Sequence, residues 1–272
     1  MPYVQFQTKK IFYGIEGEGK PVFLLHGFAE DGNIWNRQIE ALKENNLLIV
    51  PDLPGSRNSE MLDWECNLKD YADVVKAIAD EVVFKNDLGK QICLMGHSMG
   101  GYITLAFAEK YPELLNSLGL FHSSAFADTE EKKLTRKKAI DFIKKNGTES
   151  FLKTSIPNLF AEETKKQNPE LIEQLFELAK TISAEALIQY YEAMILRPDR
   201  TSVLRTFQKP VLFIIGKYDN SVPLQSSLEQ CYLPPVSVVH ILENSAHMGM
   251  WEEPELSNLF LQDFLNNFSK VQ

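Results

Sequence analysis

The stretch Gly96-His97-Ser98-Met99-Gly100-Gly101 decides how this chain is interpreted. It follows an apolar run at 91–95 that is typical of a buried strand, and a helical pattern begins directly after Ser98. A sharp turn from strand to helix strains the backbone at the serine, and the glycines two positions away on either side leave room for it. The serine hydroxyl then stands exposed above the edge of the sheet, as a nucleophile requires. The alternative interpretation is a glycine-rich turn with an incidental serine.

Similar apolar runs recur along most of the chain. They show no alternation with polar residues, which is typical of strands buried on both faces of a parallel sheet. The runs lie at 21–25, 47–50, 118–121, 211–215 and 236–242, and a β-rich stretch at 3–15 ends in a glycine-containing turn. Helical patterns are found between several of them, at 34–44, 68–84 and 99–110, and a last helix is expected at 254–268. Strands that alternate with helices predict a parallel βαβ architecture, in the α/β class.

Residues 125–204 interrupt this alternation. They contain no buried-strand pattern, and their periodicity predicts amphipathic helices at 129–145, 148–159, 169–181 and 184–196. A long block of helices between two strands is most simply an inserted cap. We therefore expect a core domain made of residues 1–124 and 205–272, with a helical cap at 125–204.

Composition and charge restrict the function classes. The chain has 272 residues, 44% of them hydrophobic and 24% charged, which is ordinary for a globular protein. A formal net charge of −9 argues against a nucleic-acid partner, because no basic stripe is available to neutralise phosphates. The three cysteines suggest neither a disulfide framework nor a metal site. The sequence shows no signal peptide and no apolar run of about 18 residues that could span a membrane, so we expect a cytoplasmic protein.

A serine hydroxyl needs a base to take its proton, and a histidine on a loop at the carboxyl end of the sheet is best placed to do so. His247 lies in such a loop, between the last apolar run and the last helix. The other four histidines are in less suitable places: a tight turn, the serine turn itself, a strand end and a strand interior. They are His26, His97, His122 and His240. We therefore expect His247 to be the base.

The base in turn needs a carboxylate to orient it. Asp219 follows the apolar run at 211–215, although an aspartate in that position can equally be an ordinary turn residue. Asp128 is the alternative acid, and it can equally be a residue at a helix N-terminus. Asp52 also ends a strand, but it precedes Ser98 in the chain. The order Ser98, Asp219, His247 favours Asp219.

Backbone N–H groups are expected to bind the developing oxyanion. The N–H of Met99 lies at the start of a helix, and Gly27 allows a turn that presents the N–H of Phe28. The Phe28 side chain either lines the pocket or packs in the core. His26, Gly27 and Phe28, together with Met248, are the residues expected to line the substrate pocket.

The chain resembles members of the α/β-hydrolase fold superfamily along nearly its whole length. The matching blocks are Leu25-His26-Gly27-Phe28, Asp52-Leu53-Pro54-Gly55, Gly96 to Gly101, Gly216-Lys217-Tyr218-Asp219 with Pro223, and Ala246-His247 followed by Trp251 to Pro254. The resemblance implies a mostly parallel eight-stranded sheet flanked by helices, with a helical cap inserted after the sixth strand. It also implies a serine hydrolase that uses no metal or organic cofactor and acts on a small-molecule substrate.

Two positions depart from the pattern of this superfamily. Arg57 occupies a position after Asp-Leu-Pro-Gly where a second glycine is frequent, and Ala246 precedes the expected base where glycine is also frequent. Neither residue supplies an expected catalytic atom. Arg57 is expected to be a surface residue, or else to reshape its loop or reach an acidic group.

Three functions compete. The first is hydrolysis of an ester, thioester or lactone through an acyl-enzyme on Ser98. The second is a related reaction with the same triad, in a carbon–carbon bond hydrolase, a lyase or a haloperoxidase-like enzyme. An arginine presented by the cap to a carboxylated substrate would favour the second, and Arg197 and Arg200 are candidates unless they are exposed helix ends. The third is a low-turnover binding protein of this fold.

The cap is expected to contribute part of a modest, mostly apolar acyl pocket. Helical spacing predicts that most of its large apolar side chains pack on the core and that some line the pocket. They are Phe151, Leu152, Phe160, Leu175, Phe176, Tyr190, Tyr191 and Met194. The sequence makes no prediction of oligomeric state.

Overall fold

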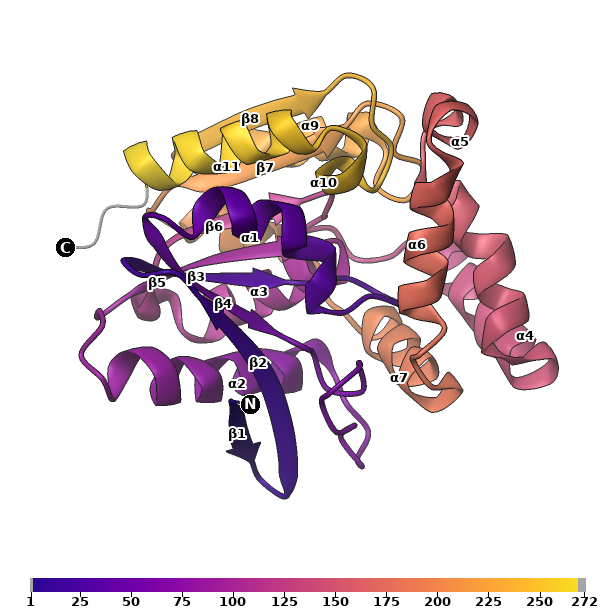
Figure 1. The fold of residues 1–272 in the computed structure, drawn as a ribbon, viewed down its shortest axis with the longest axis horizontal. Coiled ribbons are helices and arrows are strands. Elements are labelled where there is room, and N and C mark those ends of the chain that lie inside the picture. Colours follow the sequence, from indigo (N-terminus) through magenta and orange to yellow (C-terminus); the bar gives the residue numbers. More distant parts are fainter. Residues whose placement is uncertain (1, 269–272) are drawn as a thin grey trace.

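An eight-stranded sheet forms the centre of the computed structural model, which describes residues 2–268 (Figure 1). Its strands are β1 (Tyr3–Phe6), β2 (Lys9–Glu16), β3 (Lys20–Leu25), β4 (Asn46–Pro51), β5 (Ile92–His97), β6 (Leu115–Phe121), β7 (Val211–Gly216) and β8 (Ser237–Leu242). The spatial order is β1-β2-β4-β3-β5-β6-β7-β8. All neighbours from β4 to β8 are parallel, whereas β1 and β2 are antiparallel additions at one edge. The predicted mostly parallel, eight-stranded sheet is confirmed.

The apolar runs form the middle strands. Side chains of β3, β5, β6 and β7 are almost entirely buried, because helices cover both faces of a parallel sheet. The β-rich stretch at 3–15 is two strands rather than one, since the chain reverses between Phe6 and Lys9. Strand β8 lies at the other edge and is only partly buried.

Two layers of helices enclose the sheet. Helices α1 (Asn36–Leu42) and α11 (Pro254–Asn267) pack together on one face, and α2 (Leu68–Ala79) and α3 (Met99–Lys110) pack together on the other. The other helices outside the stretch between β6 and β7 are α9 (Leu224–Cys231) and α10 (Gly249–Glu252), with 3-10 turns at Gly32–Trp35 and Pro112–Leu114 and a π-helical turn at Asp80–Phe84. No helix in residues 2–268 is long and apolar enough to cross a membrane.

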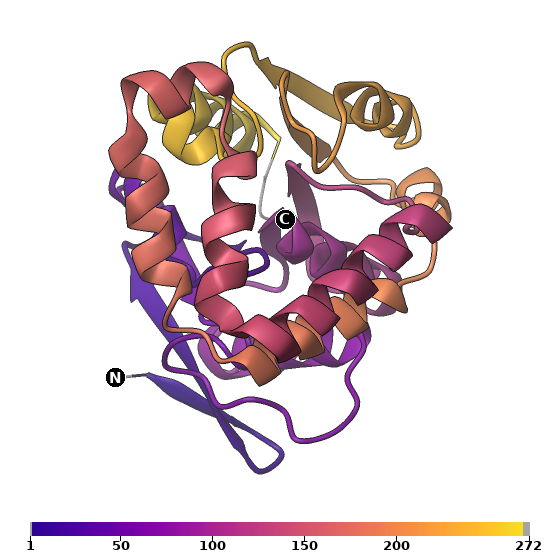
Figure 2. The ribbon, with the colours of Figure 1, turned by 90° about the vertical axis from the view of Figure 1, so that its right-hand side faces the viewer.

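A helical insertion follows β6 and ends before β7. It consists of α4 (Glu130–Ser155), a 3-10 turn (Ile156–Leu159), α5 (Glu162–Gln167), α6 (Pro169–Ala179), α7 (Ala184–Ile195) and α8 (Thr201–Thr206). We call residues 130–206 the helical insertion. Figure 1 shows α4 to α7 beside the edge of the sheet to which β3 and β8 point, and Figure 2 shows that they form an arch there.

The helices of the insertion differ from the prediction in three places. The two helices expected at 129–145 and 148–159 are joined in α4, which kinks at Gly147 with a backbone φ of 82° and ψ of 164°. Glycine adopts this conformation readily, so the chain bends without losing the second half of the helix. The short helices α5 and α8 were not predicted, because six residues are too few to show a clear apolar periodicity.

Candidate active site

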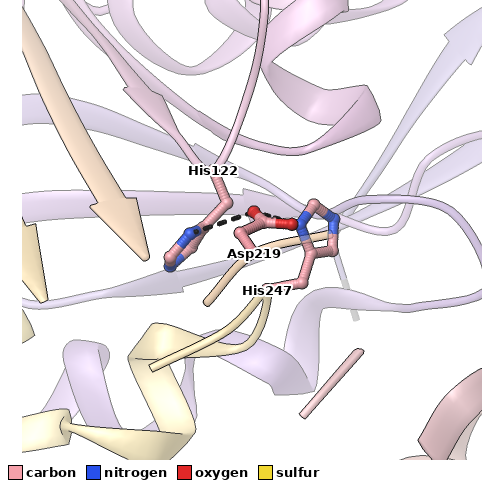
Figure 3. A group of neighbouring side chains, drawn as sticks. All are labelled: His122, Asp219 and His247. Carbon is pink, nitrogen blue, oxygen red and sulfur yellow. Dashed lines mark hydrogen bonds and ion pairs between the residues drawn. The ribbon is translucent and has the colours of Figure 1, made fainter. Parts of the chain in front are cut away.

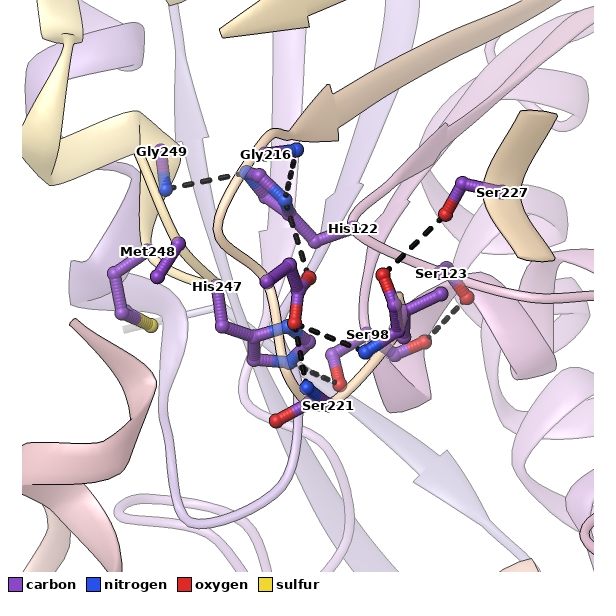
Figure 4. A network of polar contacts seen from close by, with 12 residues as sticks. Ser98, His122, Ser123, Gly216, Ser221, Ser227, His247, Met248 and Gly249 are labelled. Atoms are coloured by element: carbon purple, nitrogen blue, oxygen red, sulfur yellow. Dashed lines mark hydrogen bonds and ion pairs between the residues drawn. The ribbon is translucent and has the colours of Figure 1, made fainter. Parts of the chain in front are cut away.

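Ser98, His247 and Asp219 form a continuous hydrogen-bonded chain (Ser98 and His247 in Figure 4, His247 and Asp219 in Figure 3). The Ser98 Oγ lies 2.9 Å from His247 Nε2, and His247 Nδ1 lies 2.7 Å from Asp219 Oδ2. The serine directly follows β5, the aspartate follows β7 and the histidine follows β8, so three parallel strands bring them to one edge of the sheet. The structure therefore brings together the three residues that the sequence nominated.

The turn that carries Ser98 is strained as expected. Ser98 has a φ of 49° and a ψ of −113°, a conformation that L-residues rarely adopt. Its N–H donates to the Phe121 carbonyl at 2.9 Å, and its own carbonyl accepts from Ser123 Oγ at 2.7 Å. A Cβ at Gly96 would overlap the backbone of Gly100, so side chains cannot be accommodated at these flanking positions. The turn thus projects the serine side chain and holds it rigidly.

The two expected oxyanion donors are both available. Neither the Phe28 N–H nor the Met99 N–H donates a hydrogen bond to another residue within 2–268. The neighbouring Gly27 N–H, by contrast, is not available to an oxyanion, because it already donates to Glu30 Oε2 at 2.5 Å. This bond shapes the turn after β3 and leaves the next N–H, that of Phe28, without a protein acceptor.

A buried pair, Glu30 and His97, lies next to the hydrogen-bonded chain and contacts the backbone of His247. His97 Nδ1 is 3.0 Å from Glu30 Oε2, and His97 Nε2 donates to the backbone carbonyl of His247 at 2.9 Å. Burial raises the pKa of the Glu30 carboxyl, but His97, His26 and the Gly27 N–H together outweigh burial and hold this pKa below its usual value. Burial lowers the pKa of His97, but Glu30, the His247 carbonyl and Asp219 together outweigh burial and hold this pKa above its usual value. The pair therefore connects the turn carrying Phe28 to the loop carrying His247.

The sequence analysis did not identify Glu30. A carboxylate three residues after Gly27 is ambiguous in sequence, because acidic residues are common in turns. The available signal was the adjacency of His97 to the nucleophile combined with an acidic residue in the oxyanion turn. Only the packing of β3 beside β5 shows that these two side chains meet.

Asp219 is held ionised by its surroundings. Its Oδ1 accepts the N–H groups of Ser221 and Val222, and its Oδ2 faces the rings of His247 and His122. Burial raises the pKa of Asp219, but the two histidines outweigh it and hold the carboxyl far below its usual range. An ionised Asp219 stabilises the imidazolium form of His247.

His122 completes this cluster and was not predicted to take part in it (Figure 3). Its Nδ1 lies 3.5 Å from Asp219 Oδ2, and burial lowers its pKa to about 4. Ligand atoms of His122, Asp219 and His247 all lie within 4.8 Å of one another, a spacing that a metal ion could use. However, the two His122 nitrogens lie 3.1 Å from the Gly216 N and 3.2 Å from the Gly249 N, so the unprotonated nitrogen already accepts a backbone N–H, and both histidines share one Asp219 oxygen. Metal coordination would have to break these hydrogen bonds, so the donor set fits an acid–base network better than a metal centre.

A cavity of about 470 Å³ opens above Ser98 and His247. Phe28 lines it, as expected, and its ring stacks on that of Tyr191 with centroids 4.2 Å apart. Five of the apolar side chains expected from the insertion line it as well. They are Phe151, Leu152, Leu175, Tyr191 and Met194. The insertion thus supplies much of the cavity wall.

Three of the residues expected to line the pocket do not line this cavity. His26 is buried, with its Nε2 next to Ser56 Oγ and accepting the Leu53 N–H at 2.9 Å. Met248 is fully buried within the hydrophobic core, and Gly27 is turned toward Glu30. These residues hold the loops of the site in place and do not contact the cavity. Proximity in sequence to an expected catalytic residue does not by itself direct a side chain into the cavity.

The two cap arginines nominated for a carboxylate are buried and already paired. Arg197 Nη2 lies 2.8 Å from Asp128 Oδ1, and Arg200 Nε lies 3.2 Å from Glu109. Neither is an exposed helix end, and neither lines the cavity. Asp128 also binds Arg136 at 2.6 Å, so it is a structural partner of two arginines and is not hydrogen-bonded to His247.

The two departures from the superfamily pattern have structural explanations. Arg57 adopts a positive φ of 38°, its Nη1 donates to Asn33 Oδ1, and its Nε lies 3.9 Å from Asp31. It is therefore a largely exposed residue that also reaches an acidic group. Ala246 is buried, and its N–H donates to Glu252 at 2.8 Å. Neither substitution displaces the hydrogen-bonded chain.

Comparison with known proteins identifies the class of protein that carries this site. Residues 22–257 match the alpha/beta hydrolase family, so the chain belongs to that family and is a hydrolase. A 2-hydroxy-6-oxononadienedioate/2-hydroxy-6-oxononatrienedioate hydrolase from Paraburkholderia phymatum is 26% identical to it, with 94% of this chain and 91% of the relative covered. Lipase 1 from Psychrobacter immobilis is 28% identical, with 89% of this chain and 76% of the lipase covered. A thermophilic esterase from Thermogutta terrifontis superposes with a TM-score of 0.92 at 27% identity, with 99% of both chains covered.

Proposed function

We propose that this protein is a serine hydrolase that cleaves a small to medium carboxylic ester, thioester or lactone. The observation that carries the proposal is the hydrogen-bonded chain from Ser98 through His247 to Asp219 at the floor of the cavity. The esterase and the lipase among its relatives support the same reaction class.

The reaction would begin with attack of Ser98 Oγ on the substrate carbonyl carbon. His247 Nε2 takes the hydroxyl proton as the new carbon–oxygen bond forms, and the carbonyl oxygen becomes an oxyanion bound by the N–H groups of Phe28 and Met99. Collapse of this intermediate breaks the bond to the leaving alcohol, thiol or enol, which receives the proton from His247. An acyl group then remains on Ser98.

Deacylation would repeat these steps with water. His247 accepts a proton from water as its oxygen attacks the acyl carbon, and the same two N–H groups bind the second oxyanion. The bond to Ser98 Oγ breaks, and the serine regains its proton from His247. Asp219 remains ionised throughout and stabilises each imidazolium state.

The helical insertion would act as the cap of the site. We propose the division into a core of residues 1–124 and 205–272 and a cap of residues 125–204, because the arch of helices supplies much of the cavity wall. The cap would therefore select the substrate, while the core would supply the catalytic groups. The expected cytoplasmic location stays a prediction.

A carbon–carbon bond hydrolase is the second candidate. The relative from Paraburkholderia phymatum is named for a dienedioate and trienedioate substrate, and the same serine, histidine and aspartate could serve that reaction. Its substrate carries carboxylates, and two cations line the cavity of this protein, Lys132 and Arg136.

Labelling with a fluorophosphonate and turnover of p-nitrophenyl esters test the proposal. We expect the probe to label Ser98 alone, and Ser98→Ala to lose both labelling and more than about 10⁴-fold of the turnover number. A matched control is Ser155→Ala, because this serine lies on the cavity wall away from the hydrogen-bonded chain. Full turnover by Ser98→Ala would contradict the assignment. A series of esters from acetate to octanoate would then measure the acyl length that the cavity accepts.

A further inference from the structure

The cavity is lined by both apolar and polar side chains. Phe28 and apolar side chains of the helical insertion form what we call the apolar wall. The polar lining includes Tyr102 from α3 and Lys132 and Arg136 from the first turns of α4, and we call these three residues the cationic wall. We propose that the cationic wall binds a carboxylate of the substrate, so that the preferred substrate is an ester or lactone bearing a carboxylate. This inference rests on the proposed esterase function and adds the substrate class.

The charges around the cationic wall do not balance. Arg136 and Arg197 share a single carboxylate, that of Asp128. Lys132 forms no ion pair within residues 2–268, and its Nζ donates only to the Ser221 carbonyl at 2.8 Å. The exposed carboxylate of Glu131 also lines the cavity. These three cations and two carboxylates leave one positive charge uncompensated beside the substrate space.

Tyr102 supplies an independent observation. Its side chain is buried, with 3% of the residue exposed, and its hydroxyl makes no hydrogen bond to any described residue although it lines the cavity. The Arg197 guanidinium lies 3.9 Å from the centre of its ring. Burial raises the pKa of Tyr102, but the neighbouring cations outweigh it and lower the pKa below its usual value. A hydroxyl that opens onto the cavity and has no protein partner is free to donate to a ligand that supplies an acceptor.

The donors left over at this wall suit a carboxylate. Lys132 and Arg136 each have N–H groups beyond those that Ser221 and Asp128 accept, and Tyr102 has its O–H. The other acid in the lining, Glu30, is already paired with His97 and cannot neutralise the wall. A carboxylate would accept these donors in charge-assisted hydrogen bonds, while the rest of the substrate contacts the apolar wall.

Matched pairs of substrates test the inference on the wild-type protein. Monoethyl adipate carries its carboxylate on the acyl side and is compared with its neutral amide, ethyl adipamate. Butyryloxyacetate carries it on the alcohol side and is compared with butyryloxyacetamide. We expect kcat/KM, measured by pH-stat, to be about 10-fold to 100-fold higher for at least one carboxylate ester than for its amide. A preference in the adipate pair would place the substrate's carboxylate on the acyl side, and a preference in the butyryloxyacetate pair would place it on the alcohol side.

Variants identify the residues responsible. Lys132→Gln should reduce the preference for the carboxylate ester by about 10-fold, whereas Lys132→Arg, which retains the positive charge, should keep most of the preference. Tyr102→Phe, which removes only the hydroxyl, should reduce it about threefold. The control is Lys133→Gln, because Lys133 lies next in the same helix, pairs with Glu130 and does not line the cavity. The preference should also fall as salt is added, because water-accessible charges are screened.

Different outcomes separate failure of the inference from failure of the proposed function. If the ester bonds of the two amide-bearing compounds are hydrolysed and neither carboxylate ester is preferred over its amide counterpart, the proposed substrate class is wrong and the esterase function stands. If the preference exists but Lys132→Gln and Lys133→Gln affect it equally, the cationic wall is not its cause. If no ester is hydrolysed and the fluorophosphonate leaves Ser98 unlabelled, the proposed function itself is wrong and the inference is overturned with it.

Discussion

Ser98, Asp219, His247 and their neighbours follow the sheet strands at one edge of the sheet, which we call the core edge. The core edge and the helical insertion contribute to the same cavity in different ways. At the core edge, polar side chains such as His97, Asp219 and His122 are fully buried, and each is fixed by neighbours. On the insertion, Lys132 and Arg136 are only partly buried and keep unused donors. Buried groups with satisfied hydrogen bonds keep one geometry, whereas partly exposed groups can adapt to a ligand. We therefore propose that the reaction depends on the core edge and the choice of substrate on the insertion.

The largest effect should come from the core edge. Asp219→Asn keeps the size of the side chain but loses the negative charge that orients and stabilises His247, so we expect kcat to fall about 10⁴-fold. Steady-state kinetics with p-nitrophenyl butyrate measure this. Asp63→Asn, on an exposed surface aspartate, is the control. A loss smaller than tenfold would mean that Asp219 does not orient the base.

Breaking the buried pair tests whether the core edge acts as one unit. Glu30→Gln leaves His97 buried without its counter-charge, and we expect a loss of about 3–5 kcal/mol in the free energy of unfolding, with kcat reduced about 10-fold to 100-fold. Chemical denaturation and kinetics measure the two effects. Glu243→Gln breaks the exposed pair with Lys217 and should cost less than about 1 kcal/mol. Equal losses in both variants would show that the buried pair has no special role.

The pH dependence of the Glu30–His97 pair follows from the directions of the two shifts. The lowered pKa of Glu30 gives stability that is present above its unfolded pKa and lost as pH falls through its folded pKa. The raised pKa of His97 gives stability that is fully present below its unfolded pKa and lost as pH rises through its folded pKa. In Glu30→Gln, the loss relative to wild type should therefore be greatest in the window between these two titrations.

His122 should make the core edge sensitive to acid. Its pKa is lowered to about 4 in the folded protein, so between about pH 6.5 and 4 the unfolded chain binds a proton that the folded chain does not. Stability should fall by about 3 kcal/mol across that window. Denaturation curves at pH 7 and pH 4 measure the fall, and His122→Gln should reduce it. An unchanged pH dependence in this variant would assign the acid sensitivity to other groups.

The smallest effect should come from the insertion. Met194→Ala removes a side chain from the apolar wall and so enlarges the cavity. We therefore expect the ratio of p-nitrophenyl octanoate to p-nitrophenyl butyrate turnover to rise several-fold, with activity on p-nitrophenyl acetate changed less. Leu134→Ala removes an exposed side chain of the same insertion and should leave the ratio unchanged. An effect on acetate as large as that on octanoate would mean that the insertion shapes the reaction as well as the substrate preference.

The strands and the catalytic candidates were predictable for a common reason. Strands buried on both faces leave uninterrupted apolar runs, and a strained turn requires small neighbours, so Gly96 and Gly100 flank Ser98. Asp219 and His247 could be nominated because each follows such a run. The roles assigned to these residues remain proposals, although their geometry is the one that the sequence led us to expect.

The surroundings of the site were not predictable in the same way. Glu30 and His97 are 67 residues apart, and no local pattern shows that they meet. Arg197 was expected either to bind substrate or to be exposed, yet it is buried against Asp128, whereas Arg136 was not singled out and lines the cavity. In a helix with dense charges, periodicity separates polar from apolar faces but does not show which cation meets which partner.

By itself, the sequence determined the parallel sheet, the strained turn at Ser98 and the order of the three catalytic candidates. These features depend on local sterics and on burial, which leave their mark on neighbouring residues. Only the tertiary structure decided that Glu30 pairs with His97, that His122 joins Asp219, and that Lys132 and Arg136 line the same cavity as the apolar side chains. Those contacts join residues far apart in the chain, and their strength depends on burial and charge that exist only once the chain has folded.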